Sequence, residues 1–297
     1  MKKITKQFND KVAVITGAAS GIGFGIAKRA IKEGMKVVIA DIDQEALISA
    51  EYNLKNLGNN IISIPTDVSK ADSLEKLAQE TIDTFGKVQL LCNNAGVFLN
   101  GVLWEQSLAE WESVINVNLW GVIHGIRTFV PIMLEQDENC HIINVASTAG
   151  ITSSEHYDGI YNLSKHGVVA ISEALSNELT ALNSKIKVSV LCPSLVKTNL
   201  INSRKKFTEA IQNRDIKFEK SLENITREHP EAELALNRWM EWWNQGISPD
   251  KVGEIVFKAI KDSVFYILTD TGPVLRKMVE NRMKRILKAF DQNKKYI

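Results

Sequence analysis

The sequence has few cysteines, no long apolar run and almost no net charge, and each shortage excludes a class of protein. Its three cysteines, Cys92, Cys140 and Cys192, form no CxxC pair, which argues against a disulfide framework or a zinc site and suits a reducing cytoplasm. The five histidines show no metal-ligand spacing. No run approaches about 18 apolar residues, so no membrane-spanning helix is expected.

The charge and the start of the chain exclude further classes. A formal net charge of +1 gives no global field that would favour nucleic acid. The first ten residues are polar, so no cleaved signal peptide is expected. We therefore expect a cytoplasmic protein without a bound metal and without a nucleic-acid partner.

The sequence does contain short runs rich in Val and Ile, separated by longer segments with helical spacing. Such runs, without polar alternation, are typical of strands buried on both faces of a parallel sheet. The alternation predicts one Rossmann-type α/β domain over residues 1–297, with a doubly wound, mostly parallel seven-stranded sheet of order 3-2-1-4-5-6-7 in a three-layer α/β/α arrangement. The expected strands are residues 12–16, 36–41, 61–66, 88–93, 141–147, 187–192 and 265–269.

Capping residues predict several helix ends. Gly34 and Gly58 indicate the ends of helices over residues 22–33 and 44–57, because glycine favours the C-cap conformation. Helix starts are expected at residues 69–72, at the capping box of residues 107–110 and at Ser248-Pro249.

One stretch, residues 199–246, has no strand signal. Leu236, Trp239, Met240 and Trp243 recur at helical spacing, which favours inserted amphipathic helices. Because the stretch is short for a separate domain, we expect it to form a mobile lid over a substrate site.

The turn after the first predicted strand reads Thr16-Gly17-Ala18-Ala19-Ser20-Gly21-Ile22-Gly23. Glycine permits a sharp turn and a close approach of a pyrophosphate to the backbone, and the following helix start offers free N–H groups and a positive dipole end. Glycine clusters also occur in plain tight turns, but this strand–turn–helix context is that of a dinucleotide site. The candidate phosphate-binding residues are Gly17, Ser20, Gly21, Ile22 and Gly23.

Asp41, at the end of the second predicted strand, indicates which dinucleotide binds. A carboxylate there accepts hydrogen bonds from the adenosine ribose and repels a 2′-phosphate. Ala18, Ala19 and Ile42 offer no cation for that phosphate, so NAD is favoured over NADP, and Ile42 joins Asp41 as a cofactor-binding candidate. The alternative is that Asp41 caps the next helix, a role for which Asp43 competes.

Three motifs together give the sequence a family resemblance. The spacing TGxxxGxG, then Asn93-Asn94-Ala95-Gly96, then Tyr161-Asn162-Leu163-Ser164-Lys165, resembles the short-chain dehydrogenase/reductase family from about Lys11 to Thr269. The resemblance implies an oxidoreductase that transfers a hydride between NAD(H) and an alcohol or carbonyl substrate.

The resemblance also implies roles for residues at matching positions. The implied catalytic set is Asn118, Ser147, Tyr161 and Lys165. The implied cofactor contacts are Asp67 and Val68 at the adenine, Asn94, Ala95 and Gly96 near the centre, Tyr161 and Lys165 at the nicotinamide ribose, and Pro193, Val196 and Thr198 at the nicotinamide amide.

The residue types suit that chemistry. A phenol has a pKa of about 10, so little of it is present at neutral pH as the phenolate that could act as a base. Lys165, one helical turn after Tyr161, is expected to lower that pKa. Ser147 can donate a hydrogen bond to the substrate oxygen, and Asn118 is expected to hold a water that relays the proton. A non-redox NAD-binding sensor or scaffold on the same fold is the alternative function.

The expected pocket lining is mainly apolar and includes no obvious arginine. It favours a hydrophobic substrate such as a steroid, a retinoid, or a fatty or aromatic alcohol. The lining candidates are Val97, Phe98, Leu99, Ile151, Thr152, His156, Tyr157, Leu195 and Leu200, together with the inserted helices.

Residues 273–297 form a basic C-terminal segment. They include eight basic and two acidic residues, so this segment carries +6 and the rest of the chain −5. Such a basic amphipathic helix is suited to an anionic membrane surface, but packing on the body or on a neighbouring subunit is favoured, because members of the resembled family usually form homodimers or homotetramers. The apolar residues at helical spacing are Leu275, Met278, Val279, Met283, Ile286, Leu287 and Phe290.

Overall fold

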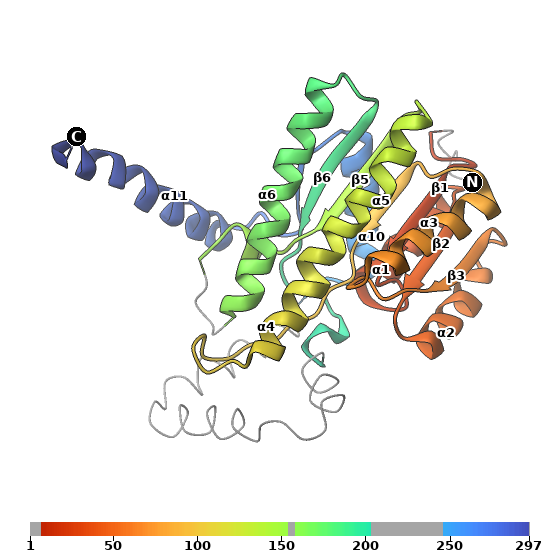
Figure 1. The fold of residues 1–297 in the computed structure, drawn as a ribbon, viewed down its shortest axis with the longest axis horizontal. Coiled ribbons are helices and arrows are strands. Elements are labelled where there is room, and N and C mark those ends of the chain that lie inside the picture. Colours follow the sequence, from red (N-terminus) through yellow and green to blue (C-terminus); the bar gives the residue numbers. More distant parts are fainter. Residues whose placement is uncertain (1–6, 154–157, 203–245, 297) are drawn as a thin grey trace.

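The computed structural model describes residues 7–153, 158–202 and 246–296. Within these residues, seven strands form one sheet in the order β3-β2-β1-β4-β5-β6-β7, and every pairing is parallel (Figure 1). The predicted strand order and the Rossmann-type α/β/α fold are therefore confirmed. The strands are β1 (Val12–Thr16), β2 (Lys36–Asp41), β3 (Ile61–Pro65), β4 (Leu90–Asn93), β5 (Cys140–Val145), β6 (Ile186–Cys192) and β7 (Tyr266–Leu268).

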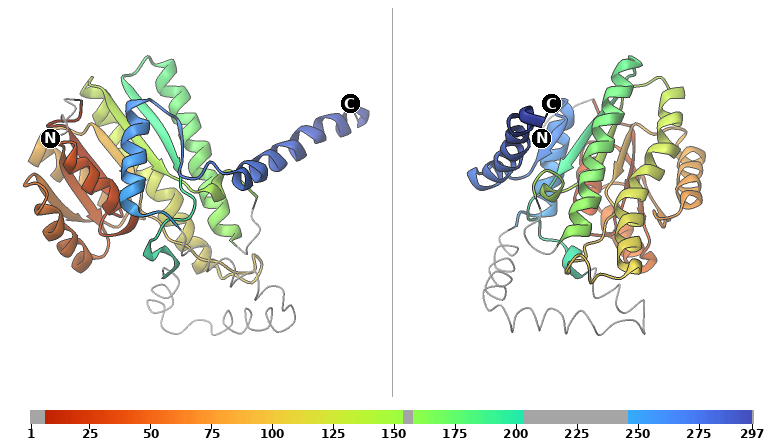
Figure 2. Two further views of the ribbon diagram at one scale, coloured as in Figure 1. Left: turned by 180° about the vertical axis from the view of Figure 1, so that it is seen from behind. Right: turned by 60° about the vertical axis from the view of Figure 1, so that its left-hand side comes forward.

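Helices cover both faces of the sheet (Figures 1 and 2). Strand β1 shows why, since Ala13 and Ile15 belong to one core cluster, and Val12 and Val14 to the other. One layer comprises α1 (Gly21–Lys32), α2 (Gln44–Lys55) and α10 (Pro249–Lys261), and the other comprises α3 (Ala71–Phe85), α4 (Leu108–Ile115), α5 (Gly121–Glu135) and α6 (Gly159–Ala181). The strand order reverses between β1 and β4, which opens a crevice at the carboxyl edge of such sheets.

Three predicted helix boundaries form as expected. Both hydrogen bonds of the capping box between Ser107 and Glu110 are present at the start of α4. Ser248 accepts a hydrogen bond from the Lys251 amide at the start of α10. Gly34, just after α1, adopts a φ of +85°. Local capping signals therefore determine these ends.

Other boundaries differ from the prediction. Ser69 does not cap α3, because its amide and hydroxyl donate to Asp67 instead, and the helix begins after Lys70. Helix α2 ends at Lys55, before the predicted Gly58. Strand β5 ends at Val145, two residues before the predicted end, so the residue at position 147 lies beyond the ladder.

A long helix in one outer layer carries part of the site. Helix α4, a π-helical turn at Asn116–Trp120 and α5 run continuously from Leu108 to Glu135. Among the described residues, this is the one helix that is long and apolar enough to cross a membrane, where the sequence pattern predicts none. It packs on β4, α3 and α6 and places Phe129 and Met133 in the core, so it is one of the helices that cover this face of the sheet.

Helix α11 (Pro273–Asn293) leaves the body instead of packing along it (Figures 1 and 2). Leu275 is its one buried side chain. The predicted helix is thus confirmed, but packing of its apolar stripe on the chain's own body is wrong. The predicted inserted helices and the lid fall mostly in residues 203–245, outside the described residues, and remain a prediction.

Candidate active site

The turn between β1 and α1 has the geometry of a phosphate cradle. Gly17 and Gly21 have φ values of +62° and +56°, a region that favours glycine. A Cβ on Gly23 would lie 2.4 Å from the carbonyl oxygen of Gly17, so a side chain there would fill the turn. Ser20, the N-cap of α1, makes no side-chain capping hydrogen bond, and Ile22 lies in the first helical turn. The first N–H groups of α1 therefore have no side-chain cap, as at helix starts that bind anions.

Asn94 and Thr16 fasten this turn to the end of β4. The Nδ2 atom of Asn94 donates to the carbonyls of Thr16 and Gly17, at 2.8 and 2.9 Å. The Thr16 hydroxyl accepts from the amides of Asn94 and Ala95, at 3.0 and 3.1 Å. Thr16 is the first residue of the TGxxxGxG spacing, but the spacing does not signal these hydrogen bonds, which depend on β1 and β4 being neighbours in the sheet.

Asp41 occupies the end of β2 beside the same turn. Its Oδ2 atom accepts from the amide of Ala19 and its Oδ1 atom from the amide of Asp43, both at 3.1 Å. Asp43 is the residue that caps α2, through the amide of Ala46, so the capping alternative for Asp41 is wrong. Ile42 is 70% exposed, so its side chain is not packed into the core.

Asp67 and Val68 follow β3, near the end of β2. Burial raises the pKa of Asp67, but hydrogen bonds from Ser69 and the nearby Lys70 outweigh it and lower the pKa overall. Val68 is buried, and its carbonyl lies 3.0 Å from Nδ1 of His124 on α5. These contacts hold the loop in one conformation and place both residues at the carboxyl edge of the sheet.

Ser147, Tyr161 and Lys165 come together beyond the end of β5. Ser147 starts the short turn at Thr148–Gly150, and its side chain hydrogen-bonds with Tyr161. The Nζ atom of Lys165 donates to the carbonyl of Val145 at 2.9 Å and lies 5.6 Å from the centre of the Tyr161 ring. Tyr161 and Lys165 are both buried on α6. Three of the four predicted catalytic residues therefore share one small volume.

Burial dominates the ionisation of Tyr161 and Lys165. It raises the pKa of Tyr161 to about 12, against a smaller lowering by the hydrogen bond with Ser147. Burial also lowers the pKa of Lys165 to about 8. The prediction that Lys165 lowers the pKa of Tyr161 is wrong here, because the ammonium is directed at the carbonyl of Val145 and burial is the larger effect.

Asn118 is the fourth predicted catalytic residue, and it lies fully buried in the π-helical turn. Its Oδ1 atom accepts from the amide of Val97 at 2.8 Å, and its Nδ2 atom donates to the Val97 carbonyl and the Ser164 hydroxyl, both at 3.0 Å. Its carboxamide therefore clamps the loop after β4 to α6, where a water-holding side chain was expected. Ser164 stands inside the predicted motif, but no spacing signals this contact.

Gly96 connects the glycine turn with these residues. A Cβ on Gly96 would lie 3.3 Å from Oδ1 of Asn118 and 3.5 Å from Nζ of Lys165. The backbone between Asn94 and Gly96 thus passes directly from the phosphate cradle to the buried ammonium.

The loop after β6 closes the other side of the site. The Thr198 methyl group lies close to Gly21, since a Cβ added to Gly21 would be 3.1 Å from that methyl group. The carbonyl of Pro193 accepts from the amide of Thr148, at 2.9 Å, next to Ser147. Val196 is buried and pairs with the segment before α10. All three predicted residues of this loop therefore border the site.

The predicted pocket lining is placed only in part. Phe98 packs the edge of its ring against Tyr161, with ring centres 5.0 Å apart. Leu99 is buried in a small core cluster, and its place in the pocket lining stays a prediction. His156 and Tyr157 lie outside the described residues.

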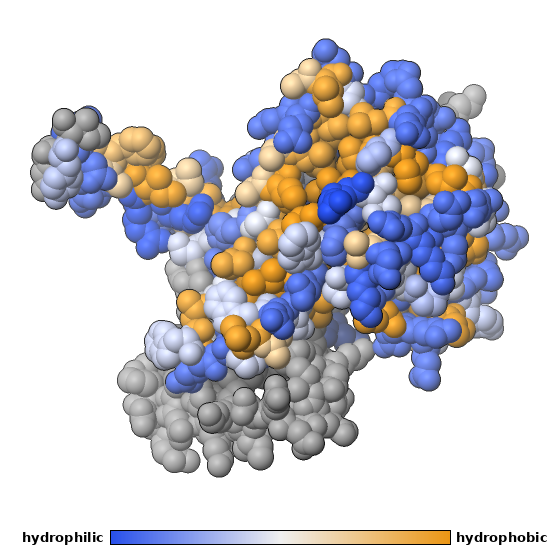
Figure 3. Space-filling view, in the orientation of Figure 1, coloured by the Kyte–Doolittle hydropathy of each residue, from blue (hydrophilic) through white to orange (hydrophobic). Residues whose placement is uncertain are grey.

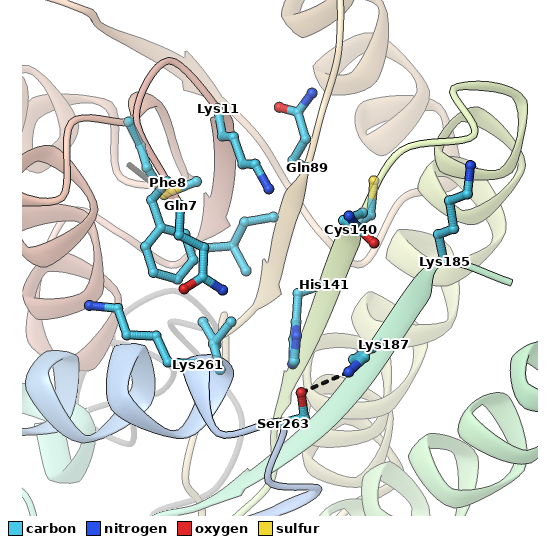
Figure 4. Close-up of a pocket in the computed structure, with 14 residues that line it drawn as sticks. Gln7, Phe8, Lys11, Gln89, Cys140, His141, Lys185, Lys187, Lys261 and Ser263 are labelled. Atoms are coloured by element: carbon cyan, nitrogen blue, oxygen red, sulfur yellow. Dashed lines mark hydrogen bonds between the residues drawn. The ribbon is translucent and has the colours of Figure 1, made fainter. Parts of the chain in front are cut away.

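A separate cavity of about 210 Å³ lies at the amino ends of the strands, at the opposite edge of the sheet (Figure 4). Lys11, Lys185, Lys187 and Lys261 line it together with His141, and none of the candidate site residues does. In the part of the chain that the structure describes, no cluster of His, Cys, Asp and Glu is arranged to hold a metal ion.

The residues at the carboxyl edge fit a dinucleotide. The uncapped N–H groups at the start of α1 suit a pyrophosphate, and the Asp41 carboxylate suits ribose hydroxyls. The buried ammonium of Lys165 lies where the backbone of Gly96 leaves space. A side chain at Gly17 or Gly23 would collide with the backbone of Ala95 or of Gly17. The turn therefore requires glycine at both positions.

Comparisons with known proteins agree with this geometry. The family model described as short chain dehydrogenase matches residues 11–209. A CLA biosynthesis dehydrogenase/reductase from Lactiplantibacillus plantarum is 33% identical over 283 residues, covering 95% of each chain. A short chain dehydrogenase/reductase from Burkholderia phymatum, solved in complex with NAD, is 38% identical with a TM-score of 0.85, covering 96% of this chain and 97% of that one. An actinorhodin polyketide ketoreductase with NADPH is 28% identical with a TM-score of 0.70, covering 89% and 96%.

Proposed function

Because the chain belongs to the short-chain dehydrogenase/reductase family, we propose that it transfers a hydride between NAD(H) and a hydrophobic alcohol or the corresponding carbonyl compound. The observation that carries this proposal is the meeting of Ser147, Tyr161 and Lys165 next to the glycine turn. A proton carrier, an oxygen-binding donor and a dinucleotide cradle are the parts that such a reaction needs.

Tyr161 is the proton carrier in this proposal. When bound, the cofactor supplies or accepts the hydride, and the phenol moves the proton at the substrate oxygen. Since burial raises the pKa of Tyr161 to about 12, the phenol is protonated at neutral pH and is ready to donate to a carbonyl oxygen. Alcohol oxidation requires the phenolate and is therefore the direction that alkaline pH favours.

Ser147 and Lys165 act on either side of that phenol. Ser147 hydrogen-bonds with Tyr161, so its hydroxyl is placed to donate to the same substrate oxygen and to stabilise negative charge there. Lys165, with a pKa of about 8, is mostly charged at pH 7 and stands where it would hold the nicotinamide ribose.

Asn118 is a positioning residue in this scheme. Its bonds to Val97 and Ser164 join the loop after β4 to the helix that carries Tyr161 and Lys165. Ser164 in turn donates to the carbonyl of Tyr161 at 2.7 Å. The clamp therefore acts on the position of the catalytic residues.

Asp41 supports NAD as the cofactor. Its carboxylate stands at the end of β2 beside the glycine turn, where it would repel a 2′-phosphate. The related solved structures are with NAD in one case and NADPH in another, so the argument rests on Asp41 and not on the family as a whole.

A hydrophobic substrate is supported by the residues next to Tyr161. Phe98 contacts the Tyr161 ring directly. Val97 precedes Phe98, Ile151 ends the short turn that Ser147 begins, and both are partly buried. Steroids, retinoids, and fatty or aromatic alcohols have the apolar surface that such a lining would bury.

Absorbance of the reduced nicotinamide tests the proposal. The purified protein is mixed with NAD or NADP and a panel of alcohols that runs from short polar to long apolar. Turnover with NAD that rises with the apolar size of the alcohol is expected. Tight NAD binding without turnover across the panel, in either direction, would instead support the non-redox sensor or scaffold.

A further inference from the structure

Helix α11 extends from the body as an arm, defined here as residues 273–296 (Figures 1 and 2). Its helix of 21 residues is about 30 Å long, which is close to the diameter of a small domain. Leu275 is buried at its start, and further along Nη2 of Arg285 donates to the hydroxyl of Ser153 at 2.6 Å. These two contacts join the arm to the body.

Four apolar side chains from the middle of the arm outward share one face. Met283, Ile286, Leu287 and Phe290 follow the i, i+3, i+4, i+7 spacing of a single helical face. They are 45%, 44%, 61% and 71% exposed, and Figure 3 shows apolar side chains gathered along the arm. Most helical stability in proteins comes from packing of an amphipathic face, so the exposed face of α11 needs a partner.

The charge of the arm restricts what that partner can be. The arm carries all eight basic residues of the C-terminal segment, which sums to +6, while the rest of the chain carries −5. Two arms side by side would bring like charges together, which opposes their pairing. The body of a second copy has the opposite net charge, so charge complementarity favours body over arm.

A second copy also satisfies the geometry. Each chain offers one arm and one body, so a two-fold axis buries both apolar faces in a single closed arrangement. An anionic membrane would attract the same charges, but the exposed stripe is narrow and has no tryptophan to anchor it at an interface.

We propose that α11 is an exchange arm, with Met283, Ile286, Leu287 and Phe290 docked on the body of a second copy of this chain. The second copy's arm docks reciprocally. Because Arg285 hydrogen-bonds with Ser153, the exchange takes place close to the turn that Ser147 begins.

The first test measures the mass of the full chain in solution by light scattering. The Ile286→Glu/Phe290→Glu variant places two carboxylates on the proposed contact and should lower the assembled mass by about half. Its matched control is Ile48→Glu/Tyr52→Glu on α2, which changes an isoleucine and an aromatic residue at the same spacing, 60% and 73% exposed. The control should leave the mass unchanged, and circular dichroism establishes that both variants are folded.

The second test identifies what the arm touches. A photo-crosslinking phenylalanine analogue replaces Phe290, and unlabelled chains are mixed with chains labelled with heavy nitrogen and allowed to exchange. We expect crosslinks that join a light to a heavy chain, from position 290 to a peptide of the body.

Three results would overturn the proposal. The first is an unchanged mass in Ile286→Glu/Phe290→Glu, and the second is crosslinking only within one chain or between two arms. The third is salt-sensitive sedimentation of the full chain with phosphatidylglycerol vesicles that is lost in Ile286→Glu/Phe290→Glu while the mass stays constant. That last result would assign the arm to an anionic lipid surface.

Discussion

The ammonium of Lys165 lies 5.6 Å from the centre of the Tyr161 ring and directs its hydrogen bond to the carbonyl of Val145. Both groups are buried, one helical turn apart on α6. Burial favours the neutral form of each, so the phenol holds its proton more tightly and the amine less tightly than in water. The pH behaviour of the protein should report both effects.

Replacing Lys165 with methionine should change the pH dependence of stability. The ordinary pKa of 10.5 falls to about 8 in the folded state, so the unfolded chain binds the proton more tightly. This costs the wild type about 3 kcal/mol at most below pH 8, and the cost disappears as the pH rises from 8 to 10.5. Lys165→Met should therefore gain stability relative to wild type as the pH falls from 10 to 7.

Urea unfolding of both proteins at the two pH values measures this difference. Lys76→Met, a change on the exposed face of α3, serves as the control and should show no comparable trend. A stability difference between Lys165→Met and wild type that is independent of pH would contradict the buried charge.

The preferred direction of catalysis should follow the ionisation of Tyr161. Since its pKa is raised to about 12 by burial, the protonated phenol predominates through the neutral range. Carbonyl reduction uses that form and alcohol oxidation uses the phenolate. The kcat/KM for oxidation should therefore increase with pH between about 6 and 9, and that for reduction should stay level or decline. Steady-state rates in both directions test this, and an oxidation rate that falls with pH would exclude a phenolate base.

Asp41→Ala should weaken the preference for NAD over NADP. Wild-type discrimination of about 1–2 kcal/mol, or roughly 5–30-fold, is expected from a phosphate facing a carboxylate. Asp43→Ala is the matched control, because it removes the cap of α2 but not the carboxylate beside the glycine turn. Fluorescence titration with both cofactors measures the ratio, and equal wild-type affinities would show that Asp41 does not select the cofactor.

Asn118→Ala should destabilise the fold. The change removes three hydrogen bonds of a fully buried carboxamide to Val97 and Ser164, and leaving such partners unsatisfied costs about 1–3 kcal/mol. Asn116→Ala, at an exposed position in the same π-helical turn, should be close to neutral. Denaturant unfolding compares them, and an Asn118→Ala variant as stable as wild type would remove the clamp from the account.

The sheet was predictable because burial on both faces leaves a plain pattern. The five residues of β1 are all buried, and the short run rich in valine and isoleucine favours a buried strand over a helix. The start of α3 was not predictable in the same way, because Ser69 has two uses and bonds to Asp67 rather than to the helix. Amphipathic spacing predicts that α11 is a helix with one apolar face. It does not predict which protein surface buries that face.

The site was predictable where spacing encodes proximity. Tyr161 and Lys165 share a helix face, and Ser147 stands at a strand end, so the motif brings three residues together. The partners of Asn118 were not predictable, because they depend on a π-helical turn and on α6 passing beside it. The raised pKa of Tyr161 was missed for a similar reason, since it reflects burial by the whole fold and not the neighbouring lysine.

The central claim is that Tyr161 moves the proton in an NAD-dependent hydride transfer, and the Tyr161→Phe variant tests it most directly. The change removes only the phenolic oxygen, so turnover with NAD and a hydrophobic alcohol should fall about 10²–10⁴-fold while the NAD dissociation constant changes little. Tyr52→Phe, on the exposed face of α2, should keep wild-type activity. Near-full activity of Tyr161→Phe, measured by absorbance of the reduced nicotinamide, would contradict the account.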